Sequence, residues 1–532
     1  MPIGLAYTYK LQIDFGHGGS YSHALADVTA RWMNFNLVYG FQDPYGVVAP
    51  PSKLTFRLRN NDGLLTPSNT SSAFYGLLTR GTLVKITATY NGTTYINWTG
   101  KIASIKPRIE QTADPQNNAV VDITAEDPMQ KLLKGQIFPK LQTSVTINAA
   151  LTAIMNSTDM PVVWPYASSW AVLDVSVMGT ARLYSPDLLT ASVSSTTLPY
   201  VGDNASDRYN SVGMGSYITD LMMAECGGRF FWNGSKFEFQ DRYYSSNQAL
   251  SPGVALTLYS DDLRNADYRY GEDLVNAVTV TFEPRQVGSV GTVLYSAPRV
   301  ITLRALDSLT VNCQYRDPNT PNARIGALTT IDPVAGTDYI ANTASDGSGS
   351  NVTAYITASL QAKAQSASVT LVNPTGIDVY ITTLQVRGTP LYTYERQTVT
   401  AVDAQSVYDN DPIPQSYNVK LIGDVDTALG YAQTQVARFK DAIDRFQSIR
   451  FIANTTKLLT ASVSIGSLIT VNDNENSRSN HTYVVVGIQH QADAAKREHY
   501  TTYTLSPLGR DAYWLLGVAG SSELDDTAII AL

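Results

Sequence analysis

The residues best suited to hold a metal or move a proton are the five histidines, His17, His23, His481, His490 and His499. A zinc site needs several such side chains converging on one point. His481 and His490 are an odd number of residues apart around one expected strand, which places the two imidazoles on opposite faces. No HExxH or CxxC motif is present. The sequence therefore predicts neither a metal site nor a cofactor.

Paired carboxylates occur at Glu126 with Asp127 and at Asp525 with Asp526. Neighbours in a strand point to opposite faces, whereas a glycosidase needs two carboxyl groups facing each other across a cleft. No Walker A loop and no G-x-S-x-G motif is found. We therefore expect a protein that is not an enzyme and has no catalytic residues.

Two further stretches have a possible binding chemistry. The loop from Asp346 to Asn351 is rich in the hard oxygen ligands that Ca²⁺ prefers, but its spacing is not that of an EF-hand, and a plain loop is the favoured interpretation. Trp164 and Trp170 could stack on sugars, although a place in a hydrophobic core is favoured for both.

Composition indicates a globular, β-rich chain. The 532 residues include 44% hydrophobic and only 16% charged residues, with 32 tyrosines, which suits many short strands joined by turns. The net charge of −8 and the absence of Lys/Arg clusters exclude tight binding to a phosphate backbone. Cys226 and Cys313 are expected to be reduced, buried thiols. No secretory signal and no membrane span are expected, so the protein would be made in a cytosol.

One β-hairpin pattern occurs twice. Residues 81–102 alternate between apolar and polar positions on either side of Asn91-Gly92, the strongest short signal for a tight hairpin turn. Residues 466–488 resemble them: Gly-Ser-Leu-Ile-Thr-Val matches Gly-Thr-Leu-Val-Lys-Ile. We also match Thr482-Tyr483 with Thr94-Tyr95, and Gly487 and Ile488 with Gly100 and Ile102. The interpretation is one β-unit used twice, the alternative being two ordinary hairpins that coincide.

Other elements follow from periodicity. Residues 144–156 and 216–226 predict helices, the second capped by Ser216 and stopped by Gly227-Gly228. A hairpin with a two-residue Asn233-Gly234 turn follows. Residues 424–446 predict the longest helix, with an apolar stripe that includes Ile443 and Phe446. That stripe either lies on a sheet of its own chain or forms a seam against a partner copy.

The order of these motifs resembles a known family. DVTAR, KLTFRLRNNDGLLTPSN, the hairpin at 81–102 and VVDITAEDPMQKLL are similar to the N-terminal domain of minor tail or tail-hub proteins of long-tailed bacteriophages. The helix followed by GGRFFWNGSKFEFQDR resembles the second domain of the same family, and the ending near Ser521-Ser522-Glu523-Leu524 is also similar. The stretch Tyr39-Gly40-Phe41-Gln42-Asp43 departs from the family pattern, which carries a basic segment there.

The resemblance implies a fold and a role. The fold would be mainly β with α+β portions, in several domains: 1–140, a tail-tube-like β-barrel; 141–255, an α+β domain; 256–290 with 397–510, a second tail-tube-like domain that includes helix 426–446; 291–396, an inserted β-sandwich; and 511–532, a docking tail. The role would be that of a structural baseplate or tail-tip hub in the virion.

The resemblance also implies partners. Such a hub would be a homotrimer with pseudo-six-fold symmetry, in contact with the tail tube and with distal fibres or a spike. Its lumen would be crossed by viral DNA only in transit, during ejection. The alternative is a receptor- or carbohydrate-binding tail protein that acts through the insert at 291–396.

Overall fold

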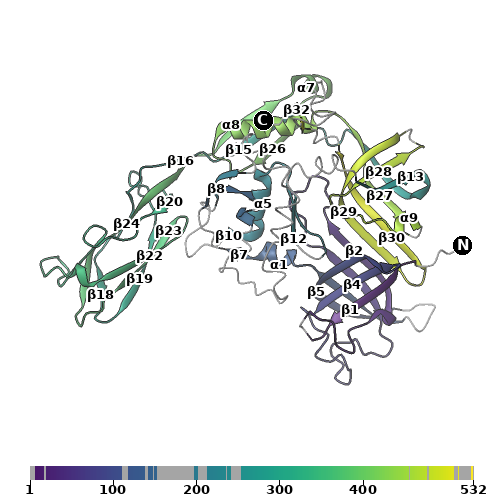
Figure 1. Ribbon diagram of the computed structural model, residues 1–532, viewed down its shortest axis with the longest axis horizontal. Coiled ribbons are helices and arrows are strands. Elements are labelled where there is room, and N and C mark those ends of the chain that lie inside the picture. Colours follow the sequence, from purple (N-terminus) through teal and green to yellow (C-terminus); the bar gives the residue numbers. More distant parts are fainter. Residues whose placement is uncertain are drawn as a thin grey trace.

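The computed structural model describes residues 6–16, 19–110, 118–137, 142–147, 149–151, 197–201, 212–234, 237–240, 253–453, 456–475, 478–508, 513–514 and 529–530. Within these ranges the chain is mostly β, as expected, and consists of several sheets with a few helices (Figure 1). Its buried hydrophobic side chains form three separate clusters. The architecture is therefore multidomain.

The first half of the largest sheet comes from the N-terminal part of the chain. Its strands run in the order β1-β4-β5-β6-β3-β2, and every neighbouring pair is antiparallel. Between β4 and β5, Asn91 and Gly92 both have positive φ, 46° and 79°, as a type I′ turn requires. The strands are β1 (Thr8–Asp14), β2 (Trp32–Gly40), β3 (Lys53–Arg59), β4 (Leu83–Tyr90), β5 (Thr93–Ile109) and β6 (Ala119–Glu126).

The second half of the same sheet comes from two distant segments. A central insertion separates β13 (Val254–Tyr259) and β14 (Leu263–Tyr270) from β27 (Asp444–Ile452), β28 (Leu468–Asp473), β29 (Arg478–Asp493) and β30 (Glu498–Pro507). The two halves meet where β2 pairs with β29, and their buried residues form one continuous core. In Figure 1 the purple and yellow units lie side by side.

A second core lies beside these units and mixes helices with strands. A three-stranded sheet of order β25-β15-β26 is covered by α8. Residues 277–282 and 397–439, assigned from sequence to the second β domain, pack in this core; the division into domains otherwise stays a prediction. The elements are α1 (Met129–Lys134), β7 (Gln136–Ile137), β8 (Gln142–Thr146), β9 (Thr197–Val201), β10 (Val212–Gly213), α5 (Met214–Ala224), β11 (Arg229–Trp232), β12 (Phe237–Gln240), β15 (Ala277–Phe282), β25 (Gln397–Val402), α7 (Ala404–Asn410), β26 (Pro414–Asn418) and α8 (Val425–Phe439).

The helix expected at 216–226 is present but shifted. It begins at Met214 after Gly213, so Ser216 is not its N-cap. It ends before Cys226, whose φ of 58° is left-handed and incompatible with a continuing helix.

The helix expected from residue 144 is also wrong at its start, because 142–146 is strand β8. The connection between β11 and β12 covers residues 233–236 and is longer than the expected two-residue turn.

The longest expected helix, 426–446, is too long. α8 begins after Asp424, whose side chain accepts a hydrogen bond from the Thr427 amide, and it ends at Phe439. Ile443 and Phe446 therefore do not belong to its stripe, and Phe446 is buried on β27 instead. The apolar face of α8 packs on β15 and β25 of its own chain. Of the two interpretations of this stripe, the structure supports a helix that lies on a sheet of its own chain.

The insert forms the third core and projects to the left in Figure 1. One sheet is built around the long strand β24, and a smaller sheet has the order β19-β23-β22. Buried side chains of both sheets meet between them, which gives the expected β-sandwich. Its strands are β16 (Arg285–Val287), β17 (Thr292–Ser296), β18 (Ile301–Leu303), β19 (Ser308–Gln314), β20 (Gly326–Thr330), β21 (Tyr339–Asn342), β22 (Thr357–Ala362), β23 (Ser366–Val372) and β24 (Val379–Thr393).

The remaining elements are short: η1 (Thr29–Arg31), η3 (Ser260–Asp262), η4 (Thr353–Tyr355), α9 (Thr456–Leu459), β31 (Tyr513–Trp514) and β32 (Ile529–Ile530). No helix in the part of the chain that the structure describes has the length and apolarity to cross a bilayer.

Candidate assembly site: a duplicated strand unit

The two halves of the large sheet correspond strand for strand. The second half has the order β13-β28-β29-β30-β27-β14, so β1 to β6 match β13, β14, β27, β28, β29 and β30 both in chain order and in sheet order. A short 3-10 turn precedes β2 and another precedes β14. One difference is that β1 runs antiparallel to β4, whereas β13 runs parallel to β28. The repeat read from the sequence is therefore a repeat of structure.

The entry to each hairpin is built in the same way. The Gly81 amide donates to the Ile102 carbonyl over 2.8 Å, and the Gly466 amide donates to the Val485 carbonyl over 2.7 Å. Both glycines have positive φ, 91° and 89°, which a residue with a side chain rarely adopts. The sequence match between these two entries is therefore confirmed by geometry.

β-Bulges fall at matching places in the two units. β5 shifts register between Ile102 and Ser104, and β29 shifts between Val485 and Gly487. The strand β2 has a shift between Trp32 and Asn34, and β14 has one between Leu263 and Asn265. A bulge bends a strand locally and re-aims the residues after it. Two bulges are therefore shared by the units, whereas the shift of β14 between Asp267 and Tyr268 has no counterpart in β2.

The register of the second hairpin strand differs from the one matched in the sequence. Lys101 lies opposite Leu83, and Val484 lies opposite Leu468. Lys101 therefore corresponds to Val484. The sequence matches of Gly100 with Gly487, of Ile102 with Ile488 and of Thr94-Tyr95 with Thr482-Tyr483 are therefore wrong. The connection between Asp473 and Arg478 is longer than Asn91-Gly92, so positions near the two turns do not correspond.

The junction between the units is a strand pairing. Residues 34–40 of β2 pair antiparallel with residues 487–493 of β29. Phe35, Leu37 and Ala492 are at most 3% exposed there. Gly487 lies so close to β2 that a Cβ would stand 2.0 Å from the Phe41 carbonyl oxygen. The junction is thus a tight, apolar joint that fixes one unit against the other.

Two histidines are buried at this joint. Nδ1 of His490 lies 3.2 Å from Nε2 of His499, and the Tyr9 hydroxyl lies 2.8 Å from Nδ1 of His499. Burial lowers the pKa of His499 to about 3 and the pKa of His490 well below its usual value. Both imidazoles are therefore neutral at neutral pH and act as hydrogen-bonding core residues.

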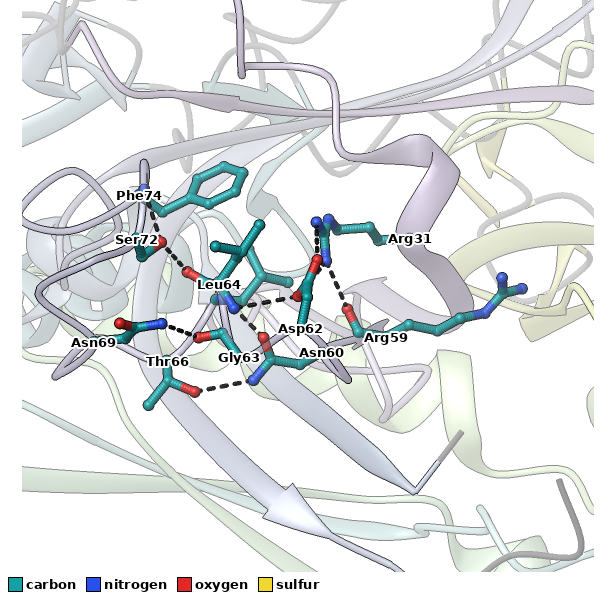
Figure 2. Close-up of polar contacts among 11 residues, drawn as sticks. Arg31, Arg59, Asn60, Asp62, Gly63, Leu64, Thr66, Asn69, Ser72 and Phe74 are labelled. Atoms are coloured by element: carbon teal, nitrogen blue, oxygen red, sulfur yellow. Dashed lines mark hydrogen bonds and ion pairs between the residues drawn. The ribbon is translucent and has the colours of Figure 1, made fainter. Parts of the chain in front are cut away.

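The connection from β3 to β4, residues 60–82, is a loop held by its own polar groups (Figure 2). Asn60 accepts a hydrogen bond from the Leu65 amide and donates one to Thr66, at 2.8 and 3.0 Å. The Arg31 guanidinium makes two hydrogen bonds to Asp62, at 2.9 and 2.6 Å. The loop that contains the NNDGLLTPSN motif is thus an ordered structure at one end of the first unit.

The loop is fixed further along as well. The Asn69 side chain donates to the Gly63 carbonyl over 3.0 Å, and the Ser72 hydroxyl donates to the Leu64 carbonyl over 2.5 Å (Figure 2). Phe74 and Leu78 lie in the core of the unit. This end of the unit therefore presents a fixed surface to any neighbouring protein.

The carboxylate pair at Glu126 and Asp127 has a structural role. Asp127 accepts hydrogen bonds from the Ser52 amide, the Ser52 hydroxyl and the Met129 amide, at 2.9, 2.5 and 2.8 Å. Burial raises the pKa of Asp127 to about 7, although the bonds from Ser52 act in the opposite direction. This carboxyl group connects β3 to the start of α1.

The oxygens of the loop 346–351 bind the loop itself. Asp346 accepts hydrogen bonds from the Ser348 amide and hydroxyl, at 2.9 and 2.6 Å, and these bonds lower its pKa. The Asn342 side chain donates to the carbonyls of Gly347 and Gly349, both at 3.1 Å. These contacts shape the turn through hydrogen bonds of the loop itself.

The structure brings no other expected chemistry together. No group of three or more His, Cys, Asp or Glu side chains with metal-binding geometry occurs among the residues that it describes. Cys226 and Cys313 are both buried, and neither forms a disulfide among the described residues. Trp164, Trp170, Asp525, Asp526 and His17 lie outside the described residues.

The insert carries a groove that the sequence did not indicate. It has a volume of about 550 Å³ beside β17 and β19 and is lined by, among others, Tyr295, Pro298, Asn312 and Arg316. The groove mixes apolar and polar walls. No signal in the sequence marks it, because it forms only when the nearby segments 293–298 and 312–321 are folded against each other.

No protein-family model matches the sequence, and no curated protein matches it. Among solved structures, the chain is similar to the 43 kDa tail protein of prophage MuSo2 from Shewanella oneidensis, at 8% identity and a TM-score of 0.44, over 94% of this chain and 98% of that one. It is also similar to a tail protein from Neisseria meningitidis, at 10% identity and a TM-score of 0.43, over 94% and 97%. A prophage tail protein from Listeria monocytogenes matches at 8% identity and a TM-score of 0.37, over 93% and 94%. Identities and TM-scores at this level do not transfer a function.

Proposed function

We propose that this chain is a structural protein of a bacteriophage tail, a hub at the distal tip that assembles into a ring around the path of the DNA. The duplicated strand unit carries the proposal. Each chain supplies two copies of one unit, rigidly joined at β2 and β29. A homotrimer of such chains would present six similar units around an axis, which matches a three-fold spike or fibre to a six-fold tube.

The sequence motifs support the same role. The sequence resembles tail-hub proteins most strongly at residues 27–135, 216–242 and 466–524. The described parts of the first two segments form the first unit and the centre of the second core. The net charge of −8 suits a channel that DNA crosses without being held. The tail tube, distal fibres or a spike, and DNA in transit are the proposed partners, and the virion tail tip is the proposed location.

Gold-labelled antibody against the protein, applied to purified phage particles, tests this role. Labelling at the distal end of the tail is expected, whereas labelling of the head or absence from the particle would contradict the proposal. Purified protein should also fail to hydrolyse peptidoglycan or capsular polysaccharide. Release of sugar or peptide products would show instead that the chain is an enzyme.

A second role, binding of a receptor or carbohydrate, is proposed for the insert alone. The insert has its own core and a groove of about 550 Å³, and it projects away from the two strand units (Figure 1). Phage that carry a chain without the insert separate the two roles. Normal particles that no longer adsorb to cells would assign receptor binding to the insert, whereas failure to form tails would assign it a scaffold role.

A further inference from the structure

We propose that copies of this chain join edge to edge, with β14 of one copy adding to the free half of β5 in the next copy. The register is the one that β2 uses on β29 within a chain. This inference rests on the proposed ring and names the strands that form its contacts between copies.

The correspondence of the two units identifies both edges. Within a chain, β2 of the first unit pairs with the second half of β29. The counterpart of β2 in the second unit is β14, and the counterpart of that half of β29 is residues 104–109 of β5. In the part of the chain that the structure describes, β14 pairs with β27 alone, and the half of β5 beyond its bulge pairs with β6 alone. Among the described residues, no second strand pairs with either of these two edges.

Burial differs sharply between the used and unused edges. Leu37 is 0% exposed and Ala492 is 3% exposed at the internal joint, whereas their counterparts Tyr268 and Ile109 are 45% and 89% exposed. Tyr270, which corresponds to Tyr39, is 67% exposed. Large apolar side chains that stand on an open strand edge indicate a surface that another protein covers.

The charges of the two edges fit in this register. Asp267 would lie opposite Arg108, an opposite-charge pair of the kind that stabilises neighbouring strands. Arg269 would lie opposite Lys106. Arg269, however, already bonds to Glu272 in its own chain, and this carboxylate balances the second positive charge.

The contact between copies would be weaker than the internal joint. At the internal joint the Phe41 amide donates to the Val486 carbonyl, and the Ala494 amide donates to the Met33 carbonyl. Hydrogen-bonded pairs recur at every second residue of antiparallel strands, so Leu37 and His490 form such a pair. Pro107 stands at the counterpart of His490 and has no N–H, so one hydrogen bond is lost.

The same residues also restrict which strands can pair. Lys106, Pro107 and Arg108 are exposed side chains of a type that keeps open edges from pairing indiscriminately. The pairing ends at Tyr270, because Gly271 has a φ of 68° and turns the chain away. Ser104 of β5 stands at the position that corresponds to Gly487. Inside the chain the close approach of the strands requires a glycine there, so the pairing between copies cannot continue in the same way.

This geometry makes a head-to-tail contact. Each copy offers β14 to one neighbour and β5 to the other, so the contact repeats around a ring when the rotation closes. The same relation then joins unit to unit both within and between chains. That repetition is what gives similar surroundings to all units of the ring.

A paired-cysteine experiment on the full chain tests the register. The Asp267→Cys, Arg108→Cys variant places two thiols at a non-hydrogen-bonded pair, where Cα atoms lie about 4.5 Å apart and a disulfide can form. Under mild oxidation we expect covalently linked dimers and higher species on non-reducing gels. The Asn36→Cys, Gln491→Cys variant, at the equivalent place inside the chain, should close a disulfide within one copy.

An out-of-register variant completes the experiment. Asp267→Cys with Ile109→Cys should cross-link at least about tenfold more slowly, because neighbouring residues point to opposite faces. If the internal control closes while the variant with Cys at 267 and 108 forms no links between copies, the inference is overturned.

Single substitutions test the same edges without thiols. Tyr268→Asp and Ile109→Asp change exposed side chains and should leave the melting temperature unchanged. Each should raise the dissociation constant of the assembly at least about tenfold by mass photometry, whereas Tyr355→Asp, a 63% exposed site on the insert, should not. Assemblies that persist in both edge variants would refute the edge pairing but leave the ring intact. A wild-type protein that stays monomeric at micromolar concentration would refute the ring as well.

Discussion

His490 and His499 lie ring to ring under the joint of the two units, with 3.2 Å between Nδ1 of the first and Nε2 of the second. One histidine is on β29, which pairs with β2, and the other is on β30. Because both rings are buried and neutral, we expect the stability of the joint to depend on pH.

Acid should weaken the fold at this joint. The pKa of His499 falls from about 6.5 in an unfolded chain to about 3 when folded. In that window the unfolded state binds the proton and the folded state does not, so the free energy of unfolding falls as pH falls from about 6.5 towards 3. Melting temperatures measured from pH 7 to pH 4.5 should therefore decline.

The His499→Gln variant checks the cause. It should melt lower than wild type at pH 7, because the hydrogen bonds to Tyr9 and His490 are changed, but its melting temperature should depend less on pH. His481→Gln, at an exposed position, is the control and should keep the wild-type slope. An unchanged slope in His499→Gln would assign the acid sensitivity to other groups.

The loop after β3 should depend on Asn60 more than on Asp62. Asn60 is 4% exposed and satisfies the buried Leu65 amide, so Asn60→Ala should cost about 1–3 kcal/mol in the free energy of unfolding. Asp62→Ala breaks a more exposed ion pair and should cost below about 1 kcal/mol. Denaturant unfolding of the two variants gives the comparison, and equal losses would contradict it.

Helix α8 should tolerate charge on one side only. Ala432 is 0% exposed on the face that packs on β15 and β25, and Ala432→Asp should destabilise the second core by about 3 kcal/mol or more. Leu429 is 36% exposed, and Leu429→Asp should cost little. Circular dichroism melts distinguish them. Comparable losses would mean that a further surface covers the outer face of the helix.

Gly487 should not accept a side chain. Its Cβ would stand 2.0 Å from the Phe41 carbonyl, so Gly487→Ala should force the two units apart and destabilise the chain by about 1–3 kcal/mol. Gly376→Ala is the matched control, since nothing lies within 4 Å of its Cβ. Thermal unfolding measures both, and a neutral Gly487→Ala would show that the joint can relax.

The insert should be removable. Phe282 pairs with Gln397, and the Arg396 guanidinium bonds to Glu283 over 2.9 Å, so the two ends of the insert lie side by side. Replacing residues 284–395 by Asn-Gly should turn β15 and β25 into an ordinary hairpin and leave the other two cores folded. Limited proteolysis and calorimetry check this result, and loss of all cooperative unfolding would contradict it.

Local pattern predicted the elements whose cause is local. The alternation in β3, β4 and β6 and the Asn91-Gly92 turn defined the first unit, and the matching glycines at 81 and 466 disclosed its repeat. The joint of β2 with β29 was not predicted, because pairing between strands so distant in sequence leaves no local signal. The exposed side chains of Ile109 and Tyr268 were missed for the same reason.

Helix ends were the weakest predictions. The stripe of α8 continues at helical spacing to Ile443 and Phe446, but the chain leaves the helix after Phe439, and Phe446 is taken up by the core on β27. At the end of α5, Cys226 adopts a left-handed conformation usually left to glycine. In both places tertiary packing overrode a continuous local pattern.

The adjacent ends of the insert also bear on how such a chain changes over generations. A segment attached at a single point can be exchanged by recombination, or can diverge freely, while the strands that carry its ends keep their pairing. Variation in the insert is thereby separated from the constraints on the strands that carry its ends.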